Sequence, residues 1–595
     1  MKKFGPALLL ISLIFCAYLP ALRNGFVWDD TALILRDPFI RSWRLIPEGF
    51  QHFLFTDATA SDFYRPIQRL TYTLEYCAFA VNPMPYHLTS ILLHAAAAVA
   101  LWFLSGELLR IFAVEEKARR IACGFAVTAW ALHPVHNAAV DYVAGRADPL
   151  AALFGFTGLF FALRGERGKR SAAWIVAAVG CFLLSALSKE SGLIFPVLWL
   201  LFLVLRRRWK ALGPWVLASA VIVCIYLSLR LPAEHIPPPT LHEPAPLLVR
   251  PIVVARAVAE YAALLVAPVH PHMERDVESR PQGYDENMVT FLAWRELQTL
   301  AGILLLGAAL TWALRTRNTQ PEVFALLCAT ATTYAPVSGI FPLNATVAEH
   351  WLYLPAAFLF LAVGVAVSRW ERNRLACRLI LALAVLWIAG LGTRTFMRAS
   401  DWKEQRLFFE RTIADGGDTA RMFINLAGVE MNAGELAKAK QHLDLALKKE
   451  PNHPLAVINE AAVAVKSHDY ASAHRWLDLA VTMPLVEAQA HELRVILAQA
   501  ETGTVDLLRM RLASRTGPSN WPIEKRYIRV LAESGNDGAA LAEVHAVLTR
   551  EPFRAETWEL LSELCAKVGK TREAESAKGR AQSYDLHLSL RPPVL

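Results

Sequence analysis

Long apolar runs separated by short polar segments fill the first two thirds of the chain. A helix needs about 20 mostly apolar residues to cross the hydrocarbon core of a bilayer. Eleven runs meet or approach this length, near residues 6–22, 86–109, 119–132, 149–164, 172–187, 191–205, 213–230, 296–314, 321–337, 351–368 and 379–393. The pattern therefore predicts an all-α fold whose residues 1–394 form a polytopic membrane domain.

The first run follows Lys2 and Lys3 and has the outline of a signal peptide. It lacks an A-x-A cleavage pattern and many further spans follow it, which favours a retained first helix.

Basic residues gather in five of the short loops between the runs. They are Arg110, Lys117, Arg119 and Arg120; Arg164, Arg167, Lys169 and Arg170; Arg206, Arg207, Arg208 and Lys210; Arg315 and Arg317; and Arg369, Arg372, Arg374 and Arg378. Cytoplasmic loops carry an excess of Lys and Arg. All five clusters and the N-terminus are therefore predicted to lie inside.

This orientation requires that the segment 250–268 does not cross the membrane. Arg250, Arg256 and Glu260 recur on it, which favours an interfacial or re-entrant helix. If the segment crosses, everything after it inverts. On the preferred count the outside segments are 23–85, 133–148, 188–190, 231–295, 338–350 and everything after 394.

Beyond residue 395 the sequence becomes charged and rich in alanine, with a period of 34 residues. The positions expected of tetratricopeptide repeats are Phe423, Leu426, Ala427, Ala439, Leu443, Ala446 and Pro451; then Val457, Ala461, Ala473, Leu477 and Ala480, with Pro484 one residue early; then Ala540 and Pro552; and Trp558, Leu561, Ala574 and Ala581. We predict a junction at 395–419 and an α-solenoid at 420–588, with 488–520 as a degenerate unit. Such solenoids bind peptides or extended protein segments.

Composition agrees with a membrane protein. Of the 595 residues, 55% are hydrophobic and only 19% are charged, whereas a soluble protein has about a quarter charged. The net charge of +8 comes from the loop clusters, so it reports topology rather than a nucleic-acid partner.

Two adjacent carboxylates, Asp29 and Asp30, open the first outside loop. Such a pair can act as a general base or bind a divalent cation, and the sequence indicates no other cofactor. The alternative is an acidic cap on the helix that starts at Thr31.

Further ionisable and aromatic residues lie at the same predicted membrane face. They are Arg65 in the first loop; His133, His136, Arg146 and Asp148 after the third span; Lys189 and Glu190; and Glu349, His350 and Tyr353. The two histidines, three residues apart, share a helical face and are candidate metal ligands, with a plain helix end as the alternative. Lys189 and Glu190 form either an ion pair or a site for an anionic head group. Aromatic residues near Glu349 are alternatively interfacial anchors.

These groups fit transfer from a phosphate-linked lipid donor. A carboxylate can accept the proton of an acceptor hydroxyl, while Arg, Lys or His neutralises the departing phosphate. Bidentate contact with phosphate would explain the arginines at positions 65 and 146.

The ordered motifs NGFVWDD, YRP, HPVHNAAVDYVAGRADPL, LSKE and EHWLYLP resemble those of the transmembrane and tetratricopeptide-repeat-containing O-mannosyltransferases and their bacterial relatives of the GT-C class. The junction TRTFMRASDWKEQRLFFERTI, with Arg394, Arg398, Trp402, Glu404 and Phe408, is also similar. The resemblance implies a polyprenyl- or dolichyl-phosphate-linked sugar donor, a Ser or Thr acceptor in a protein, and a catalytic role for Asp29 and Asp30. Two positions depart from the family pattern: Asn137 replaces an acidic residue, and His350 replaces an arginine.

The sequence therefore predicts an inverting glycosyltransferase whose repeats bind the acceptor or partner proteins. It would lie in the inner membrane with periplasmic repeats in a bacterium, or in the ER membrane with lumenal repeats in a eukaryote. One alternative is a non-catalytic membrane scaffold for envelope assembly. A transporter is a third hypothesis, but the polar residues gather at one face rather than at mid-bilayer.

Overall fold

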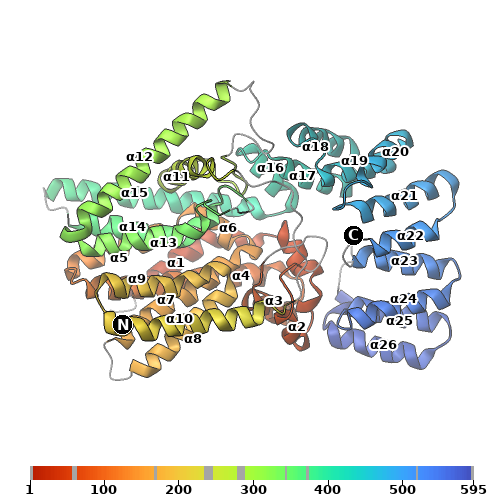
Figure 1. Cartoon of the computed structure of the whole chain (residues 1–595), viewed down its shortest axis with the longest axis horizontal. Coiled ribbons are helices and arrows are strands. Elements are labelled where there is room, and N and C mark those ends of the chain that lie inside the picture. The colour runs from red at the N-terminus through yellow and green to blue at the C-terminus, as the bar shows by residue number, and fades with distance from the viewer. Residues whose placement is uncertain are drawn as a thin grey trace. The chain divides into compact units, whose positions relative to one another are not determined.

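The computed structural model describes residues 5–55, 63–166, 171–233, 246–277, 289–341, 343, 345–369, 374–516 and 520–590 (Figure 1). In these ranges the regular elements are helices, and extended pairing is limited to one isolated bridge between Arg275 and Val347. The all-α prediction is confirmed. The chain forms two compact units: Met1–Val27, Pro83–Pro232 and His242–Gly417 make unit 1, and Trp28–Asn82, Ala233–Leu241 and Asp418–Leu595 make unit 2.

Every predicted membrane span is helical in unit 1. Its main helices are α1 (Gly5–Tyr18), α4 (Pro83–Ile111), α5 (Glu116–Ala131), α7 (Ala147–Gly165), α8 (Ser171–Ser188), α9 (Ile194–Leu205), α10 (Trp209–Arg230), α11 (Arg250–Val266), α12 (Val289–Thr319), α13 (Pro321–Tyr334), α14 (Tyr353–Ser368), α15 (Arg374–Arg398) and α16 (Gln405–Ala414). Among the described residues, seven helical segments are long and apolar enough to cross a membrane, and they match seven of the eleven predicted spans. The other four, in α5, α8, α9 and α13, are shorter or less apolar. This composition supports a multi-pass membrane protein.

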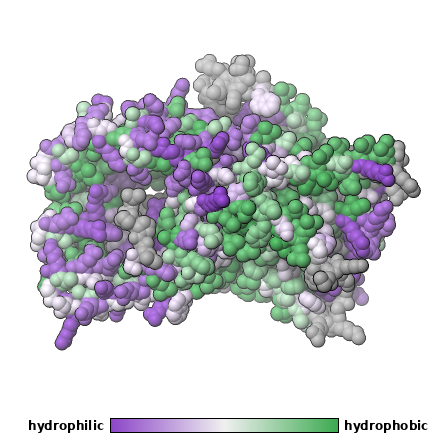
Figure 2. All heavy atoms as spheres, turned by 180° about the vertical axis from the view of Figure 1, so that it is seen from behind, coloured by the Kyte–Doolittle hydropathy of each residue, from purple (hydrophilic) through white to green (hydrophobic). Residues whose placement is uncertain are grey.

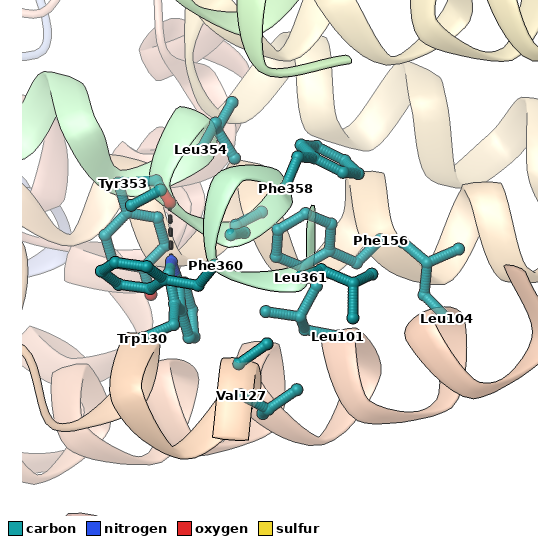
Figure 3. Close-up of a cluster of buried hydrophobic side chains, with 14 of the residues drawn as sticks. Leu101, Leu104, Val127, Trp130, Phe156, Tyr353, Leu354, Phe358, Phe360 and Leu361 are labelled. Atoms are coloured by element: carbon teal, nitrogen blue, oxygen red, sulfur yellow. Dashed lines mark hydrogen bonds between the residues drawn. The ribbon is translucent and has the colours of Figure 1, made fainter. Parts of the chain in front are cut away.

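The core of unit 1 forms where α7 packs on α4 and α8 and where α14 packs on α5 and α13. Figure 3 shows side chains from α4, α5, α7 and α14 pointing toward one another, among them Leu101, Trp130, Phe156 and Phe358. Glycine allows two of these helices to approach closely, since a Cβ at Gly158 would lie 2.7 Å from the ring of Phe182. Small residues at helix contacts are typical of membrane bundles.

Large apolar side chains also cover the outside of unit 1. Several leucine and isoleucine side chains on α12 and α15 are more than half exposed, for example Leu304 and Leu383. Figure 2 shows hydrophobic colouring over much of this unit and mostly hydrophilic colouring over the repeats. An exposed apolar surface on long helices is what contact with lipid requires.

The segment 250–268, predicted not to cross the membrane, forms α11 and packs along α12. Its Arg256 is buried, donates from Nε to Thr299 Oγ1 at 2.9 Å, and pairs with Glu296 at 3.0 Å. The arginine that made a crossing unfavourable thus has partners on α12. The position of α11 relative to a membrane stays a prediction.

In the part of the repeats that the structure describes, unit 2 forms five pairs of helices. They are α17 (Ala420–Asn432) with α18 (Leu436–Lys449), α19 (Pro454–Lys466) with α20 (Tyr470–Ala480), α21 (Glu487–Thr502) with α22 (Leu507–Arg515), α23 (Trp521–Glu533) with α24 (Asp537–Arg550), and α25 (Ala555–Lys567) with α26 (Thr571–Tyr584). The pairs begin 34, 33, 34 and 34 residues apart. The alanines and leucines at the predicted signature positions are buried, as helix contact requires. The stretch 488–520 holds a pair with a short second helix of nine residues.

The first loop, 28–82, belongs to the same unit as the repeats, which the sequence did not indicate. It contains α2 (Ile46–Phe50) and α3 (Pro66–Phe79). The ring of Phe39 lies 4.5 Å from that of Phe553, between α24 and α25. Tyr76 donates its hydroxyl hydrogen bond to Asp585 Oδ1 at 2.8 Å, just beyond α26. The acidic pair is therefore carried by a loop that is packed on the solenoid.

Candidate functional site

The acidic pair lies at the start of unit 2. Trp28, directly before it, has a left-handed backbone with a φ of +50°. Asp29 is half-buried and Asp30 is fully buried. Asp30 precedes the short helix η2 (Thr31–Arg36), but its side chain does not accept a capping hydrogen bond from that helix. The structure therefore gives no support to the interpretation of Asp30 as a helix cap.

Two arginines organise the rest of the first loop. Arg65 is half-buried at the start of α3, with its guanidinium carbon 4.2 Å from the ring centre of Phe63. Arg69, one turn later, is buried and donates to Asp37 Oδ2 at 3.0 Å. It also donates to the carbonyl oxygens of Gly49, His52, Phe53 and Leu54. Arg69 thus holds together the loop that carries the acidic pair, and only its spacing of four from Arg65 hinted at it.

The predicted residues His133, His136 and Tyr353 come together in the core of unit 1. The ring of His136 lies 4.7 Å from that of Tyr353 and 6.3 Å from that of His133. Trp130 donates from Nε1 to the Tyr353 carbonyl at 2.8 Å, the dashed line in Figure 3. The Tyr353 hydroxyl donates to Nδ1 of His94 at 2.6 Å. His94, a polar residue inside an apolar run, is a member of this cluster that the sequence interpretation missed.

The two loop histidines differ in their hydrogen bonds. Nε2 of His133 donates to the Leu265 carbonyl at 3.1 Å, and Nδ1 accepts from the Val135 amide at 3.3 Å. Neither ring nitrogen of the fully buried His136 has a hydrogen-bond partner among the described residues. Burial lowers the pKa of His133 to about 4 and lowers that of His136 well below its usual value, the latter aided by its two histidine neighbours. Both rings are therefore neutral near pH 7.

Asp141 is a buried carboxylate next to this cluster. It accepts a hydrogen bond from Asn137 Nδ2 at 2.5 Å, and Asn137 donates to the Thr395 carbonyl at 3.0 Å. Burial raises the pKa of Asp141 well above its usual value, although Asn137 and Arg398 oppose the shift. Asn137, where the family pattern has an acidic residue, thus serves as the hydrogen-bond donor to this carboxyl group.

Lys189 and Asp148 form an ion pair. Nζ of Lys189 lies 2.7 Å from both carboxylate oxygens of Asp148, and both side chains are largely buried. Glu190 is half-buried and begins the short helix η7 (Glu190–Leu193). Arg146 is fully buried and donates to the Tyr86 carbonyl at 2.6 Å.

Glu349 is the centre of a buried charge cluster. Its Oε2 lies 2.6 Å from the guanidinium of Arg398, and its Oε1 lies 3.7 Å from that of Arg275. Arg398 also donates to the Pro134 carbonyl at 2.8 Å, so it joins α15 to the loop that holds the histidines. His350 is half-buried, with its ring 6.1 Å from that of Trp351. Arg275 was not among the predicted site residues, because nothing in its local sequence distinguishes it.

The predicted site residues therefore fall into two sets. Unit 1 holds His133, His136, Arg146, Asp148, Lys189, Glu190, Glu349, His350 and Tyr353, and unit 2 holds Asp29, Asp30 and Arg65. Within the described ranges, no three His, Cys, Asp or Glu side chains come close enough together to hold a metal ion. Both ring nitrogens of His133 are already used in hydrogen bonds, so this conformation does not present His133 as a ligand.

Three quarters of the chain align with curated relatives. Protein O-mannosyl-transferase TMTC3 of Mus musculus is 24% identical over 490 residues, covering 76% of this chain and 52% of the relative. Protein O-mannosyl-transferase F38B6.6 of Caenorhabditis elegans is 24% identical over 457 residues, covering 75% and 63%. TMTC3 of Homo sapiens is 22% identical over 483 residues, covering 75% and 51%. The chain thus spans about half to two thirds of the length of these relatives.

No protein-family model matches the chain. Among solved structures, YrrB, described as a TPR protein with an unusual peptide-binding site, is 20% identical and has a TM-score of 0.22. The alignment covers 31% of this chain and 95% of the YrrB chain.

Proposed function

We propose that this chain transfers a sugar to Ser or Thr hydroxyls of a protein. Its resemblance to the protein O-mannosyl-transferases of the TMTC type is confirmed by its relatives. The sugar is mannose or another hexose, and the donor is a polyprenyl- or dolichyl-phosphate-linked sugar. The observation that carries the proposal is the alignment of three quarters of the chain with these named transferases. The reaction is of the inverting GT-C type and takes place on the extracytoplasmic side.

In this proposal Asp29 or Asp30 is the general base. The carboxylate accepts the proton of the acceptor hydroxyl, whose oxygen attacks the anomeric carbon of the sugar. The bond from that carbon to the phosphate oxygen breaks, and the lipid phosphate leaves with the electron pair. Asp29 is the less buried of the two, which favours its access to a hydroxyl.

We assign the donor phosphate to Arg65, Arg146, Lys189 and His350, whose side chains are cationic or can become so. Because Asp148 already pairs with Lys189, a phosphate that binds this lysine has to displace the carboxylate or share the ammonium group with it. His133, His136, Glu190, Glu349 and Tyr353 are assigned to the shape of the donor site. Of these residues, His136 is the best candidate for a direct hydrogen bond to the donor, because its buried ring nitrogens have no hydrogen-bond partner among the described residues.

The test is transfer by the purified full-length protein in lipid nanodiscs, with a polyprenyl-phosphate sugar and a Ser- or Thr-containing polypeptide. Loss of a general base lowers the rate by about 100-fold to 10,000-fold. We expect such a loss in Asp29→Asn or Asp30→Asn, with membrane insertion unchanged. Glu116→Gln, at an exposed carboxylate that begins α5, should retain full activity. Normal transfer by both aspartate variants would disprove the proposal.

The five helix pairs favour one second candidate, a non-catalytic membrane scaffold that recruits proteins through the repeats. It predicts that the acidic pair is dispensable and that truncation after residue 400 removes all phenotype. Comparison of the glycoproteins of a deletion strain with those of its parent distinguishes the two candidates. Missing O-linked sugars support the transferase, and an unchanged glycoprotein set supports the scaffold.

A further inference from the structure

Trp28 has an unusual backbone directly before the acidic pair. It is the first residue of unit 2, and its φ of +50° places a bulky side chain in the left-handed region, which such residues rarely adopt. Its carbonyl oxygen accepts hydrogen bonds from the amide and the hydroxyl of Thr31, at 3.1 and 2.7 Å. The turn therefore determines the direction in which Asp29 and Asp30 leave it.

The Trp28 ring contacts the first helix of the solenoid. The guanidinium carbon of Arg421 lies 5.5 Å from the ring centre, within the range of a cation–π interaction. Arg421 belongs to α17 and is only three residues beyond Asp418, where the chain returns to unit 2. The contact thus joins the residue before the acidic pair to the beginning of the repeats.

The remainder of the loop is attached to the other end of the solenoid. The rings of Phe39 and His52 lie 4.5 and 5.5 Å from that of Phe553. The Leu586 amide, which follows α26, donates to the Arg41 carbonyl at 3.2 Å. Because the loop is held at both ends of the repeats, the placement of the acidic pair relative to the repeats depends on these contacts and on that of Trp28 with Arg421.

We infer that Trp28 and Arg421 are positioning residues that pass an extended acceptor polypeptide from the first repeat to the acidic pair. The inference rests on the proposed function. A solenoid presents an elongated binding surface. Arg421, on the first helix of the repeats, contacts the residue directly before Asp29. A long acceptor that binds both the repeats and the acidic pair then gains affinity from the contact between Trp28 and Arg421. A short acceptor that reaches only the acidic pair does not.

The experiment uses the full-length protein in nanodiscs with saturating lipid-linked sugar and two acceptors of the same central sequence. The long acceptor has about 30 residues, enough to extend roughly 100 Å, and the short one has about 6. For Trp28→Ala and for Arg421→Ala we expect the KM of the long acceptor to rise about tenfold, which corresponds to about 1.4 kcal/mol. For Arg421→Ala, the KM of the lipid donor and the kinetics of the short acceptor should change less than about twofold. Trp28→Ala also alters the turn before Asp29, so Arg421→Ala alone carries the comparison of the two acceptors.

Conservative variants separate a positioning role from a structural one. Trp28→Phe keeps a ring and Arg421→Lys keeps a cation, so both should restore most of the affinity for the long acceptor. The double variant should be no worse than either single one, because the two residues act through one contact. Arg526→Ala, which removes an exposed arginine that pairs with Glu492 on α21, is the matched control and should leave both acceptors unaffected.

Equal effects of Arg421→Ala on long and short acceptors, additive effects in the double variant, or wild-type kinetics in both alanine variants would each overturn the inference. The failure of the proposed function has a different signature, since Asp29→Asn and Asp30→Asn would then remain active. Inactive aspartate variants combined with an unaffected Arg421→Ala would reject only the positioning role.

Discussion

Single buried charges in this protein depend on partners that are distant in the sequence. Arg398 and Glu349 are both almost completely inaccessible, with 2.6 Å between guanidinium and carboxylate. Arg275 also approaches Glu349, at 3.7 Å, and the Pro134 carbonyl accepts from Arg398 at 2.8 Å. Removing one member of a buried ion pair leaves the other charge without compensation, which is more costly than losing the pair as a whole.

We therefore expect Arg398→Gln to lower the free energy of unfolding by about 3 kcal/mol. The double variant Glu349→Gln with Arg398→Gln should recover part of this loss, because it leaves no unpaired carboxylate. Thermal unfolding of the full-length protein in detergent measures both. Arg394→Gln is the control, since Arg394 lies one turn earlier on α15, is only half-buried and donates to the Val269 carbonyl. Equal melting temperatures for the Arg394 and Arg398 variants would contradict this account.

The same distance in sequence limits what could be predicted at the residue scale. The motifs identified Asp148, Lys189, Glu349 and Tyr353 as polar residues at unusual positions. They did not reveal that Asp148 pairs with Lys189 or that Tyr353 bonds to His94, 259 residues away. A single sequence carries no signal for such pairs. His94 is a different case, because a histidine inside an apolar run is costly unless it has a partner.

At the scale of elements, the helices of the membrane domain could be predicted from the length of the apolar runs, and those of the repeats from the 34-residue period. The least regular repeat was the one least well predicted, since its second helix, α22, has only nine residues. Helix pairing was not predictable, because it depends on where small residues permit close approach. Gly302 on α12 is such a place: a Cβ there would lie 1.8 Å from the Ala255 carbonyl oxygen on α11.

We expect Gly302→Ala to separate α11 from α12 and to destabilise the protein by about 1–3 kcal/mol, the usual cost of overpacking. Gly307→Ala, on the same helix, is the matched control because nothing lies within 4 Å of its added Cβ. Alanine should be neutral or slightly stabilising there, since it favours helix over glycine by about 1 kcal/mol. Thermal unfolding in detergent compares the two, and a Gly302 variant as stable as the Gly307 variant would mean that the two helices are not in contact.

At the scale of the whole molecule, the two long segments of unit 2 are widely separated in the linear sequence. The loop 28–82 and the repeats beyond residue 418 form one compact unit, although more than 300 residues of unit 1 lie between them in the sequence. Charge patterning predicted that both segments lie on the same side of the membrane, as their joint packing requires. The sequence could not predict that packing, since neither segment carries a local signal for the other.

The predicted orientation of the protein in the membrane rests on the positive-inside rule and on whether α11 crosses. Arg315 and Arg317 lie near the C-terminal end of α12, just after its apolar run, and are predicted to be cytoplasmic, whereas the repeats are predicted to be extracytoplasmic. Among the described residues, α11 is not one of the helices long and apolar enough to cross a membrane, which favours a helix that does not cross, although the partners Glu296 and Thr299 lower the cost of burying Arg256.

Reporter fusions test this orientation. Alkaline phosphatase, which is active only outside the cytoplasm, should be inactive when fused after Arg317 and active when fused after Asn452, in the turn between α18 and α19. A fluorescent protein that matures only in the cytoplasm should give the opposite pattern at the same positions. If both fusions invert, α11 crosses the membrane. If only the second inverts, one of the spans between the two positions does not cross, and the repeats with their acidic loop cannot meet a donor on the outer side.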